Sequence, residues 1–290
     1  MEEFRNIGII GRLGSKKVVE TVRRLKRYLV EEGYHVILQD RIAEVMPGHG
    51  MQVSTQKLLG EICDLVIVVG GDGTILNTAR TYVDSNIPVL GVNLGRLGFL
   101  ADVSVDSMAS AVTEILNGEF IKEQRSLLNC QIEQNGKVLS EHLAFNEVVI
   151  HRNETPRMIE FELHVDEDFV NNQRADGIIV TTPTGSTAYA LSSGGPIMHP
   201  STNAICLVSI SPHTMSHRPF ILHGESEVII SLLDCDERAT ISFDAQSSVS
   251  ASEGVSLRVK RHDNFVHLIH PKGYDYFEII RSKLHWGQKV

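Results

Sequence analysis

Residues 66–74 read Val-Ile-Val-Val-Gly-Gly-Asp-Gly-Thr, an apolar run that ends in three glycines around Asp72. The four branched residues predict a short buried strand over 65–69. An open α/β sheet presents its ligands where such strands end, so the carboxylate of Asp72 is a candidate for taking a proton from a substrate hydroxyl. Asp-Gly pairs also occur in ordinary turns, and the motif alone favours a functional site only modestly.

Strand-like runs and helix-like segments alternate through the first part of the chain around this motif. Strands are expected at 7–10, 36–38, 65–69 and 88–92, and helices at 16–32, 55–62, 74–83 and 106–117. Alternation of this kind is typical of βαβ units. The N-terminal part is therefore predicted to be an α/β domain with a Rossmann-like parallel sheet.

From about residue 126 the pattern changes to short stretches in which apolar and polar residues alternate. Asn135-Gly136 is a strong hairpin signal between two of them. Further strands are expected at 178–181, 206–210, 220–222, 227–232, 239–243 and 256–269. We therefore predict a mostly-β sandwich domain over 105–271. The α/β domain would comprise 1–104 plus 272–290, with a C-terminal helix over 274–284 that packs back on it.

Length, charge and cysteine spacing exclude several classes of protein. The 290 residues are enough for two domains, and the formal net charge of −9 argues against a general nucleic-acid surface. None of the four cysteines has CxxC spacing, which argues against a zinc or dithiol site. We find no signal peptide and no apolar run near the ~20 residues of a membrane span, so we expect a cytoplasmic location.

Three further polar clusters are candidates for ligand binding. The first is Asn-Leu-Gly-Arg-Leu-Gly-Phe-Leu at 93–100, and the second is Asn146-Glu147 inside an apolar strand. A buried carboxylate without a partner is costly, so Glu147 needs donors. Ribose hydroxyls and an adenine amino group would serve, and so would another strand's backbone or an arginine. The third cluster, 175–196, is rich in Gly, Ser and Thr, and its Tyr189 suits either stacking on a base or core packing.

Taken together, these motifs resemble the NAD kinase family, and most of all the enzymes of Gram-negative bacteria. The Gly-Gly-Asp-Gly motif at 70–73 also occurs in diacylglycerol kinases and phosphofructokinases, whereas Asn-Glu at 146–147 and Thr-Pro-Thr-Gly-Ser-Thr-Ala-Tyr at 182–189 are far more specific. The resemblance covers Ile7 to about Trp286. It implies phosphorylation of the adenosine 2′-hydroxyl of NAD by ATP to give NADP, with a divalent cation (Mg²⁺ or Mn²⁺). It also implies a homodimer or homotetramer.

The resemblance also implies roles for individual residues. Asp72 would accept the proton, and the glycine-rich loop of Gly70, Gly71, Gly73 and Thr74 would hold the phosphates of ATP. The residues implied to bind NAD are Asp72, Gly73, Asn146, Glu147, Arg157, Arg174, Asp176, Thr187, Ala188, Tyr189, Ala190, Leu191, Ser192 and Gln246. Because these residues come from both halves of the chain, we expect a crevice between the domains. The resemblance assigns no metal ligand.

The chain departs from the family pattern at Asp244-Ala245-Gln246, where the family usually has Asp-Gly-Gln. If the family glycine has a positive φ, Ala245 costs stability there. Two other interpretations stay open: a lipid or sugar kinase that shares the Gly-Gly-Asp-Gly motif, and a non-catalytic NAD(H) sensor. A P-loop enzyme is excluded because GxxxxGK[ST] is absent from the sequence, and a dehydrogenase is disfavoured because no GxGxxG follows the first strand.

Overall fold

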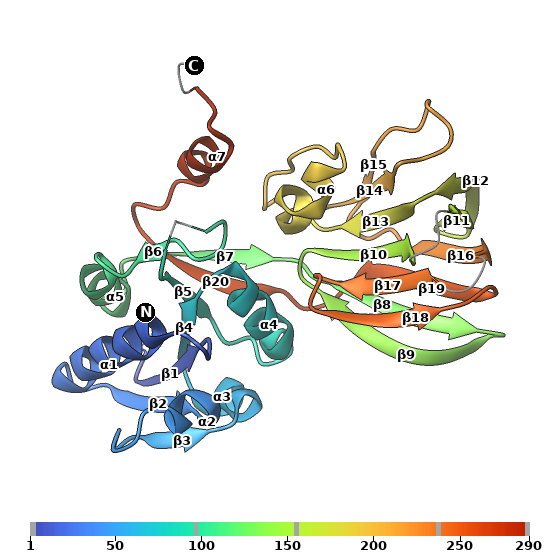
Figure 1. Ribbon diagram of the computed structural model, residues 1–290. Coiled ribbons are helices and arrows are strands. Elements are labelled where there is room, and N and C mark those ends of the chain that lie inside the picture. Colours follow the sequence, from blue (N-terminus) through green and yellow to red (C-terminus); the bar gives the residue numbers. More distant parts are fainter. Residues whose placement is uncertain (1–3, 96–97, 154–156, 236–238, 288–290) are drawn as a thin grey trace. The chain divides into compact units, whose positions relative to one another are not determined.

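The computed structural model describes residues 4–95, 98–153, 157–235 and 239–287. Its contacts divide the chain into two compact units, Met1–Gln124 with Val266–Val290, and Arg125–Phe265. Figure 1 shows an α/β layer structure in the first unit and a pair of packed sheets in the second.

The first unit is built on one sheet with the strand order β3-β2-β1-β4-β5-β20-β7, in which β6 also pairs with β5. Neighbours from β3 to β5, and β20 with β5, are parallel. The order 3-2-1-4-5 is that of a doubly wound fold, so the predicted Rossmann-like sheet is confirmed. The strands are β1 (Asn6–Gly11), β2 (His35–Gln39), β3 (Gln52–Ser54), β4 (Leu65–Gly70), β5 (Val89–Asn93), β6 (Val103–Ser104), β7 (Phe120–Arg125) and β20 (Val266–Pro271).

Helices cover both faces of this sheet. On one face α1 (Lys16–Glu31) contacts α5 (Met108–Leu116), and on the other α3 (Gln56–Ile62) contacts α4 (Asp72–Tyr82) (Figure 1). A short helix, α2 (Asp40–Glu44), follows β2. The predicted apolar stripe of α1 is buried against the sheet, as its spacing of three and four residues requires: Val18, Val22, Leu25 and Leu29.

The strand order reverses between β1 and β4, which places a topological switch point at their carboxyl ends. Gly11 pairs with Val69, and the Arg12 N–H donates to the Val69 carbonyl at 3.2 Å. In open α/β sheets a ligand crevice lies at this point, because the two flanking chains leave on opposite faces. Asp72 follows β4 directly, so the parallel sheet brings it to the expected ligand-binding edge.

The second unit is a sandwich of two sheets, ordered β15-β14-β13-β10-β17-β18 and β12-β11-β16-β19-β8-β9. Alternate residues of both sheets, such as Val148, Ile178, Phe161 and Leu257, form one buried core. The predicted sandwich is therefore confirmed. The strands are β8 (Leu128–Gln134), β9 (Lys137–Ala144), β10 (Glu147–Arg152), β11 (Ile159–Val165), β12 (Asp168–Ala175), β13 (Gly177–Thr181), β14 (Ala204–Ile210), β15 (Phe220–His223), β16 (Val228–Asp234), β17 (Ala239–Phe243), β18 (Ser247–Ala251) and β19 (Val255–Arg261).

The division between the units differs from the predicted boundaries at 104/105 and 271/272. The expected strand over 256–269 is two strands: β19 stays in the sandwich, whereas β20 pairs in parallel with β5. Helix α5 and strand β7 belong to the first unit because they extend or cover its sheet. The C-terminal helix α7 (Tyr276–Leu284) also belongs to the first unit, with Ile279 and Ile280 buried.

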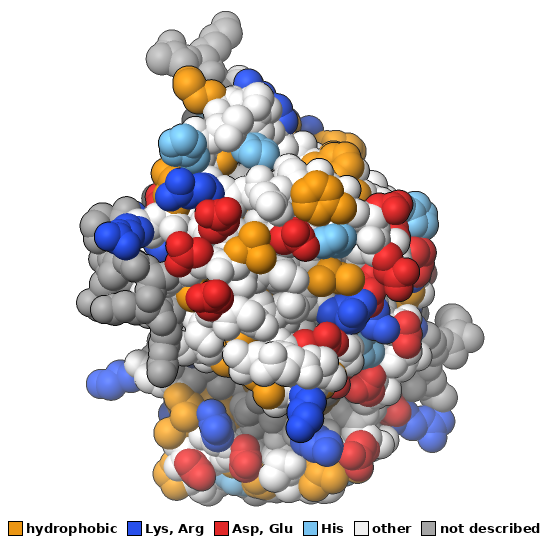
Figure 2. Space-filling model, turned by 90° about the vertical axis from the view of Figure 1, so that its right-hand side faces the viewer, with side chains coloured by type: hydrophobic (Ala, Val, Ile, Leu, Met, Phe, Trp, Pro, Cys, Tyr) orange, Lys and Arg blue, Asp and Glu red, His pale blue; other side chains and the backbone are white. Residues whose placement is uncertain are grey.

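Surface charge is mixed on the face of the molecule shown in Figure 2. Acidic and basic side chains are interspersed there, and the described side chains on that face form no broad basic area. Within the described part of the chain, no helix combines the length and the apolarity that crossing a bilayer requires.

Several hairpin turns of the sandwich have left-handed backbone, and two of them lie at positions that the sequence marked. Asn135 and Gly136 have φ of 52° and 72° in the β8–β9 turn, which confirms the predicted hairpin. Asp244 and Ala245 have φ of 52° and 53° in the β17–β18 turn. Asn, Asp and Gly tolerate this conformation, but an alanine does so only with strain. The departure at Ala245 thus lies at a position that favours glycine.

We expect Ala245→Gly to raise the free energy of unfolding by about 1 kcal/mol, because glycine removes the steric cost of the left-handed conformation. Urea unfolding of both proteins measures the difference. Ala109→Gly is the matched control, since Ala109 is an exposed residue in α5 and the same exchange should destabilise it by about 1 kcal/mol. If both substitutions destabilise the protein equally, Ala245 is not strained.

Candidate functional site

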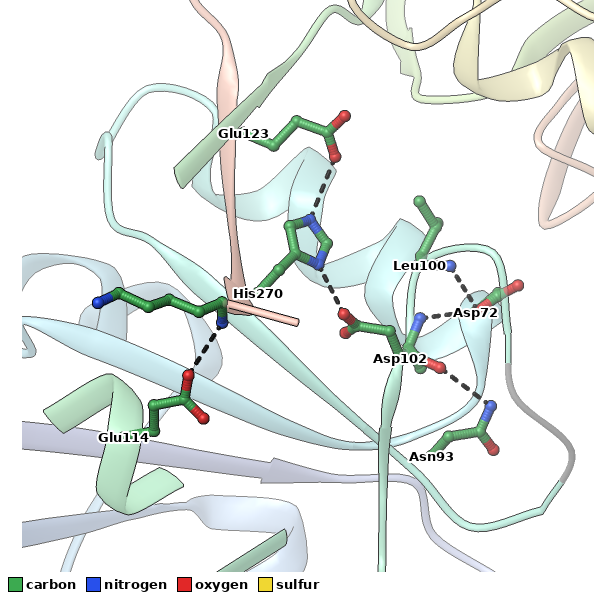
Figure 3. Close-up of polar contacts among 9 residues, drawn as sticks. Asp72, Asn93, Leu100, Asp102, Glu114, Glu123 and His270 are labelled. Carbon is green, nitrogen blue, oxygen red and sulfur yellow. Dashed lines mark hydrogen bonds and ion pairs between the residues drawn. The ribbon is translucent and has the colours of Figure 1, made fainter. Parts of the chain in front are cut away.

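The carboxylate of Asp72 is held by three consecutive backbone amides. Asp72 is the first residue of α4, after the N-cap Gly71. Its Oδ2 accepts a hydrogen bond from the Phe99 N–H at 2.9 Å. Its Oδ1 accepts from the Leu100 N–H, as Figure 3 shows, and from the Ala101 N–H, each at 3.1 Å. A carboxylate has about four acceptor positions, so one remains, on Oδ2. The side chain is thus fixed and keeps room for one further donor.

Gly98 makes this arrangement possible. A Cβ added at Gly98 would lie 2.0 Å from Asp72 Oδ1, so any side chain there would displace the carboxylate. By contrast, none of Gly70, Gly71 and Gly73 has a positive φ, and a Cβ at Gly71 would meet no atom within 4 Å. Gly98 belongs to the 93–100 motif, but the sequence did not mark it as a residue of the site.

The segment that supplies the three amides is itself braced. The buried side chain of Asn93 donates from Nδ2 to the Ala101 carbonyl at 3.3 Å and accepts from the Gly95 N–H at 2.9 Å. The Gly98 N–H donates to the same Ala101 carbonyl at 3.0 Å. These hydrogen bonds hold residues 98–101 against Asp72, the first residue of α4.

In the second unit, Glu147 begins β10 and is 4% exposed. Its Oε2 is buried and has no hydrogen-bond partner among the described residues. Burial, and then the nearby negative charge of Asp244, raise the pKa of Glu147 to about 8. Perturbed carboxyl groups of this kind are typical of binding and catalytic sites. Glu147 therefore lacks the hydrogen-bond donor that its burial calls for, and a bound ligand could supply that donor.

Asp244 orients Asn146 and Glu147. Its Oδ1 accepts from the N–H groups of Asn146 at 2.7 Å and Glu147 at 3.1 Å, and its Oδ2 accepts from that of Phe145 at 2.9 Å. Sequence patterns did not predict this role, although Asp244 belongs to the motif that departs from the family pattern. It repeats in the sandwich what Asp72 does in the α/β unit: one carboxylate binds three successive amides.

The carbonyl side of the same segment is held by Thr182. Its N–H donates to the Asn146 carbonyl at 2.9 Å, and its Oγ1 donates to the Phe145 carbonyl at 2.7 Å. Gly185 lets the following turn approach, since a Cβ there would lie 2.3 Å from the Asn146 oxygen. The segment from Phe145 to Glu147 is therefore fixed from both sides.

Glu147 lines a pocket of about 600 Å³ in the second unit. Asp176 and Tyr189 line it too, and Tyr189, 45% exposed at the start of α6 (Tyr189–Ser192), presents its ring to solvent. Asp176 forms an ion pair with Arg152 Nε at 2.7 Å, and Arg152 is a lining residue that the sequence did not predict. The sandwich thus brings three of the predicted NAD-binding residues to one pocket.

The other predicted residues do not line this pocket. Ala190 is 1% exposed and packs in an apolar cluster with Val149 and Ile179. Arg174 is exposed and lies 3.8 Å from Glu160. Thr187 donates to the Thr184 carbonyl at 3.2 Å from the end of the short 3-10 helix η1 (Thr184–Thr187). Ala188 and Leu191 are also absent from the lining of the pocket. Three further residues are exposed to solvent outside it: Arg157, Ser192 and Gln246.

We expect Glu147→Gln to change how stability depends on pH. The folded protein holds a proton on Glu147 up to about pH 8, whereas the unfolded chain releases it near pH 4.5, so stability falls as pH rises between these values. The slope is about 1.4 kcal/mol per pH unit, and the substitution should remove it. Urea unfolding from pH 5 to pH 8 measures the slope. The control Glu162→Gln, at a side chain 34% exposed, should retain the wild-type slope.

The described residues contain no group of three or more His, Cys, Asp and Glu side chains placed to hold a metal ion. The described residues therefore do not form a metal site made of protein ligands alone. Magnesium usually binds through substrate phosphates and only one or two carboxylates, a mode that needs no such cage.

Known proteins that are similar to this chain come from one family. The family described as ATP-NAD kinase N-terminal domain matches residues 7–120, and ATP-NAD kinase C-terminal domain matches residues 145–271. A protein described as NAD kinase from Pseudomonas entomophila (strain L48) is 50% identical over 291 residues, covering 100% of this chain and 98% of its own length. An NAD kinase from Ectopseudomonas mendocina (strain ymp) is also 50% identical and is covered over 99% of its length.

Two solved structures share the fold. The crystal structure of a yeast NADH kinase complexed with NADH has a TM-score of 0.91, 24% identity, and coverage of 99% of this chain and 89% of that one. An NAD kinase from Archaeoglobus fulgidus in complex with ATP has a TM-score of 0.75 and 24% identity, with 97% and 98% covered. The fold and site define a two-domain nucleotide-binding protein with a Gly-Gly-Asp-Gly carboxylate. The chain belongs to the NAD kinase family.

Proposed function

We propose that this protein transfers the γ-phosphoryl group of ATP to the 2′-hydroxyl of the adenosine ribose of NAD, giving NADP. One observation carries the proposal: the Asp72 carboxylate is fixed by three amides at the switch point of the parallel sheet and has one acceptor position left. A substrate hydroxyl is the donor that suits such a position. The names of the 50% identical relatives support the choice of NAD.

Asp72 acts as the general base in this proposal. Phosphoryl transfer passes through a loose transition state, so most of the catalysis comes from holding the attacking oxygen in line with the γ-phosphate. The free position on Oδ2 receives the 2′-hydroxyl hydrogen, orients the oxygen, and takes the proton as the new P–O bond forms. Assistance of this kind is typically worth about 10²–10⁴-fold.

The dinucleotide binds in the pocket of the second unit. Tyr189 offers a ring face to a base, and Asp176 and Glu147 accept from ribose hydroxyls or the adenine amino group. Because the pKa of Glu147 is about 8, the group is protonated at neutral pH and can also donate to a ligand oxygen. Asn146 precedes Glu147 on the segment that Asp244 holds, and its side-chain amide is proposed to bind the same ligand. The remaining residues that the family resemblance implies to bind NAD, among them Gly73, Arg157 and Gln246, are also part of this proposal.

The phosphates of ATP lie at Gly70–Thr74, where α4 begins with the positive end of its dipole and Gly71 leaves open space. The divalent cation, Mg²⁺ or Mn²⁺, arrives with these phosphates and neutralises their charge. We further propose a cytoplasmic homodimer or homotetramer, in line with the family resemblance. Light scattering that gives the mass of a single chain would contradict the oligomer.

A substrate panel tests the function. Purified protein, γ-labelled ATP and Mg²⁺ are incubated in turn with NAD, NADH, a diacylglycerol and fructose 6-phosphate, and the labelled product is identified. We expect label on the dinucleotide alone, as NADP or NADPH. Label on the lipid or sugar would favour the rival kinases, and dinucleotide binding without any transfer of label would favour a sensor.

A further inference from the structure

A buried histidine lies between two carboxylates in the first unit, outside the groups assigned above. His270, in β20, is 1% exposed. Its Nδ1 lies 2.9 Å from Asp102 Oδ2, and its Nε2 lies 3.1 Å from Glu123 Oε2, as Figure 3 shows. The Tyr274 ring stacks on the imidazole with centroids 3.9 Å apart. These contacts join the loop before β6, strand β7 and the turn after β20.

Both contacts can be hydrogen bonds only if both ring nitrogens donate. An ionised carboxylate only accepts, and a neutral imidazole carries one N–H, so two carboxylate partners require the imidazolium form. Burial by itself lowers the pKa of His270, but the hydrogen bonds and charges of Asp102 and Glu123 raise it, and the net direction is upward from 6.5. The geometry and the direction of the pKa shift both favour the imidazolium form of His270.

The other titratable groups near His270 have different partners. Tyr274 meets the imidazole with its ring face. Glu114 of α5 accepts from the Lys272 N–H, and the Lys272 ammonium pairs with Glu119. The carboxylates that face the imidazole are thus Asp102, 7% exposed, and Glu123, 16% exposed.

The side chain of Asp102 has its hydrogen bond to His270 on one oxygen, and its other oxygen, Oδ1, is buried without a partner among the described residues. Asp102 is therefore tethered by the imidazolium. It directly follows Ala101, whose N–H binds Asp72 Oδ1 and whose carbonyl accepts from Asn93 and Gly98. A shift of Asp102 therefore also moves the amides that hold Asp72.

We infer that His270 is a positioning residue for Asp72: held between Asp102 and Glu123, it anchors the end of the Phe99–Ala101 segment whose amides fix the base. It touches no substrate, because it is buried away from solvent. Its effect on turnover rests on the proposed function, whereas its effect on the three amides does not. The only sign of this role in the sequence is a histidine within an apolar strand.

The test compares His270→Gln with the wild type. Glutamine keeps a hydrogen bond to one carboxylate and loses the charge. Hydrogen exchange of the Phe99, Leu100 and Ala101 amides should become about 10- to 100-fold faster, as the loss of one charge-assisted hydrogen bond implies. The kcat should fall by a similar factor, while KM for NAD and for ATP stays within about 3-fold, because binding groups are untouched.

His164→Gln is the matched control. His164 also lies near a carboxylate, 3.6 Å from Glu162, and against an aromatic ring, that of Phe169, but it is far along the chain from the Asp72 amides. It should change neither the exchange of residues 99–101 nor kcat. Glu123→Gln, at a less buried side chain, should act in the same direction as His270→Gln and serves if that variant does not fold.

NMR of the imidazole nitrogens supplies a readout that a merely structural role would not produce. We expect both nitrogens of His270 to be protonated in the wild type at pH 7. A neutral ring, or unchanged exchange at the three amides in both His270→Gln and Glu123→Gln, would overturn the inference. Exchange and NMR need no turnover, so a wild type that makes no NADP would overturn the proposed function and leave these readouts standing.

Discussion

Asp72→Asn should lower the rate of NADP formation by about 10²–10⁴-fold while NAD still binds. Asparagine keeps the shape of the side chain and one acceptor oxygen, so the Leu100 and Ala101 amides can still be bound. Its amide nitrogen cannot accept the proton of a hydroxyl, and the basic position on Oδ2 is lost. Steady-state kinetics of the purified variant, together with calorimetric titration of NAD, measures both expectations.

A matched control separates lost basicity from lost stability. Asp64 is another carboxylate of the first unit that binds backbone amides, accepting from Arg5 at 2.9 Å and Asn6 at 2.7 Å through Oδ2. Asp64 precedes β4, whereas Asp72 follows that strand. Asp64 therefore lies at the amino end of the parallel strands, opposite the end at which Asp72 lies. Asp64→Asn should cost about 1–3 kcal/mol of stability and leave kcat unchanged. If Asp72→Asn keeps kcat within a few-fold of wild type, Asp72 is not the base.

Asp244→Ala should lower the free energy of unfolding by about 3–4 kcal/mol and raise the KM for NAD. Three amides, of Phe145, Asn146 and Glu147, lose their acceptor in a buried setting, and each loss costs about 1–3 kcal/mol unless water enters. The new alanine also keeps a left-handed φ, which adds strain. Urea unfolding and NAD titration measure the two effects.

The control for Asp244 is Asp166, which has a similar φ of 50° but binds the single amide of Glu227, at 2.7 Å, in an exposed turn. Asp166→Ala should cost only about 1 kcal/mol and leave the KM for NAD unchanged. Equal losses from the two variants would mean that Asp244 contributes only its turn geometry, and a normal KM in Asp244→Ala would remove its role in orienting Glu147.

Much of the fold follows from local patterns in the chain. The apolar stripe of α1 and the apolar run before Gly70 depend only on residues within a few positions of one another, and both form as predicted. Asn135-Gly136 likewise determines its own turn, because few other pairs accept positive φ at both positions. The two-layer sandwich follows from the same local alternation.

The residues of the candidate site were likewise predicted only in part by local patterns. Motifs marked Asp72, Glu147, Asp176 and Tyr189, since glycines beside a carboxylate and polar residues in an apolar strand stand out along the chain. The partners of these residues did not stand out. Gly98 lies 26 positions from Asp72 and Asp244 lies 97 from Glu147, and nothing in a local pattern states which distant amide a carboxylate binds.

The amino-acid sequence by itself determined many of the strands and helices, the family and the carboxylate of the proposed base, because these depend on neighbours in the chain. Only the tertiary structure decided that residues 266–271 leave the sandwich for the parallel sheet, and that His270 thereby meets Asp102 and Glu123. Strand pairing and buried charge depend on the free energy of contacts between distant segments. These contacts form only when the chain folds, so no local pattern in the sequence reveals them.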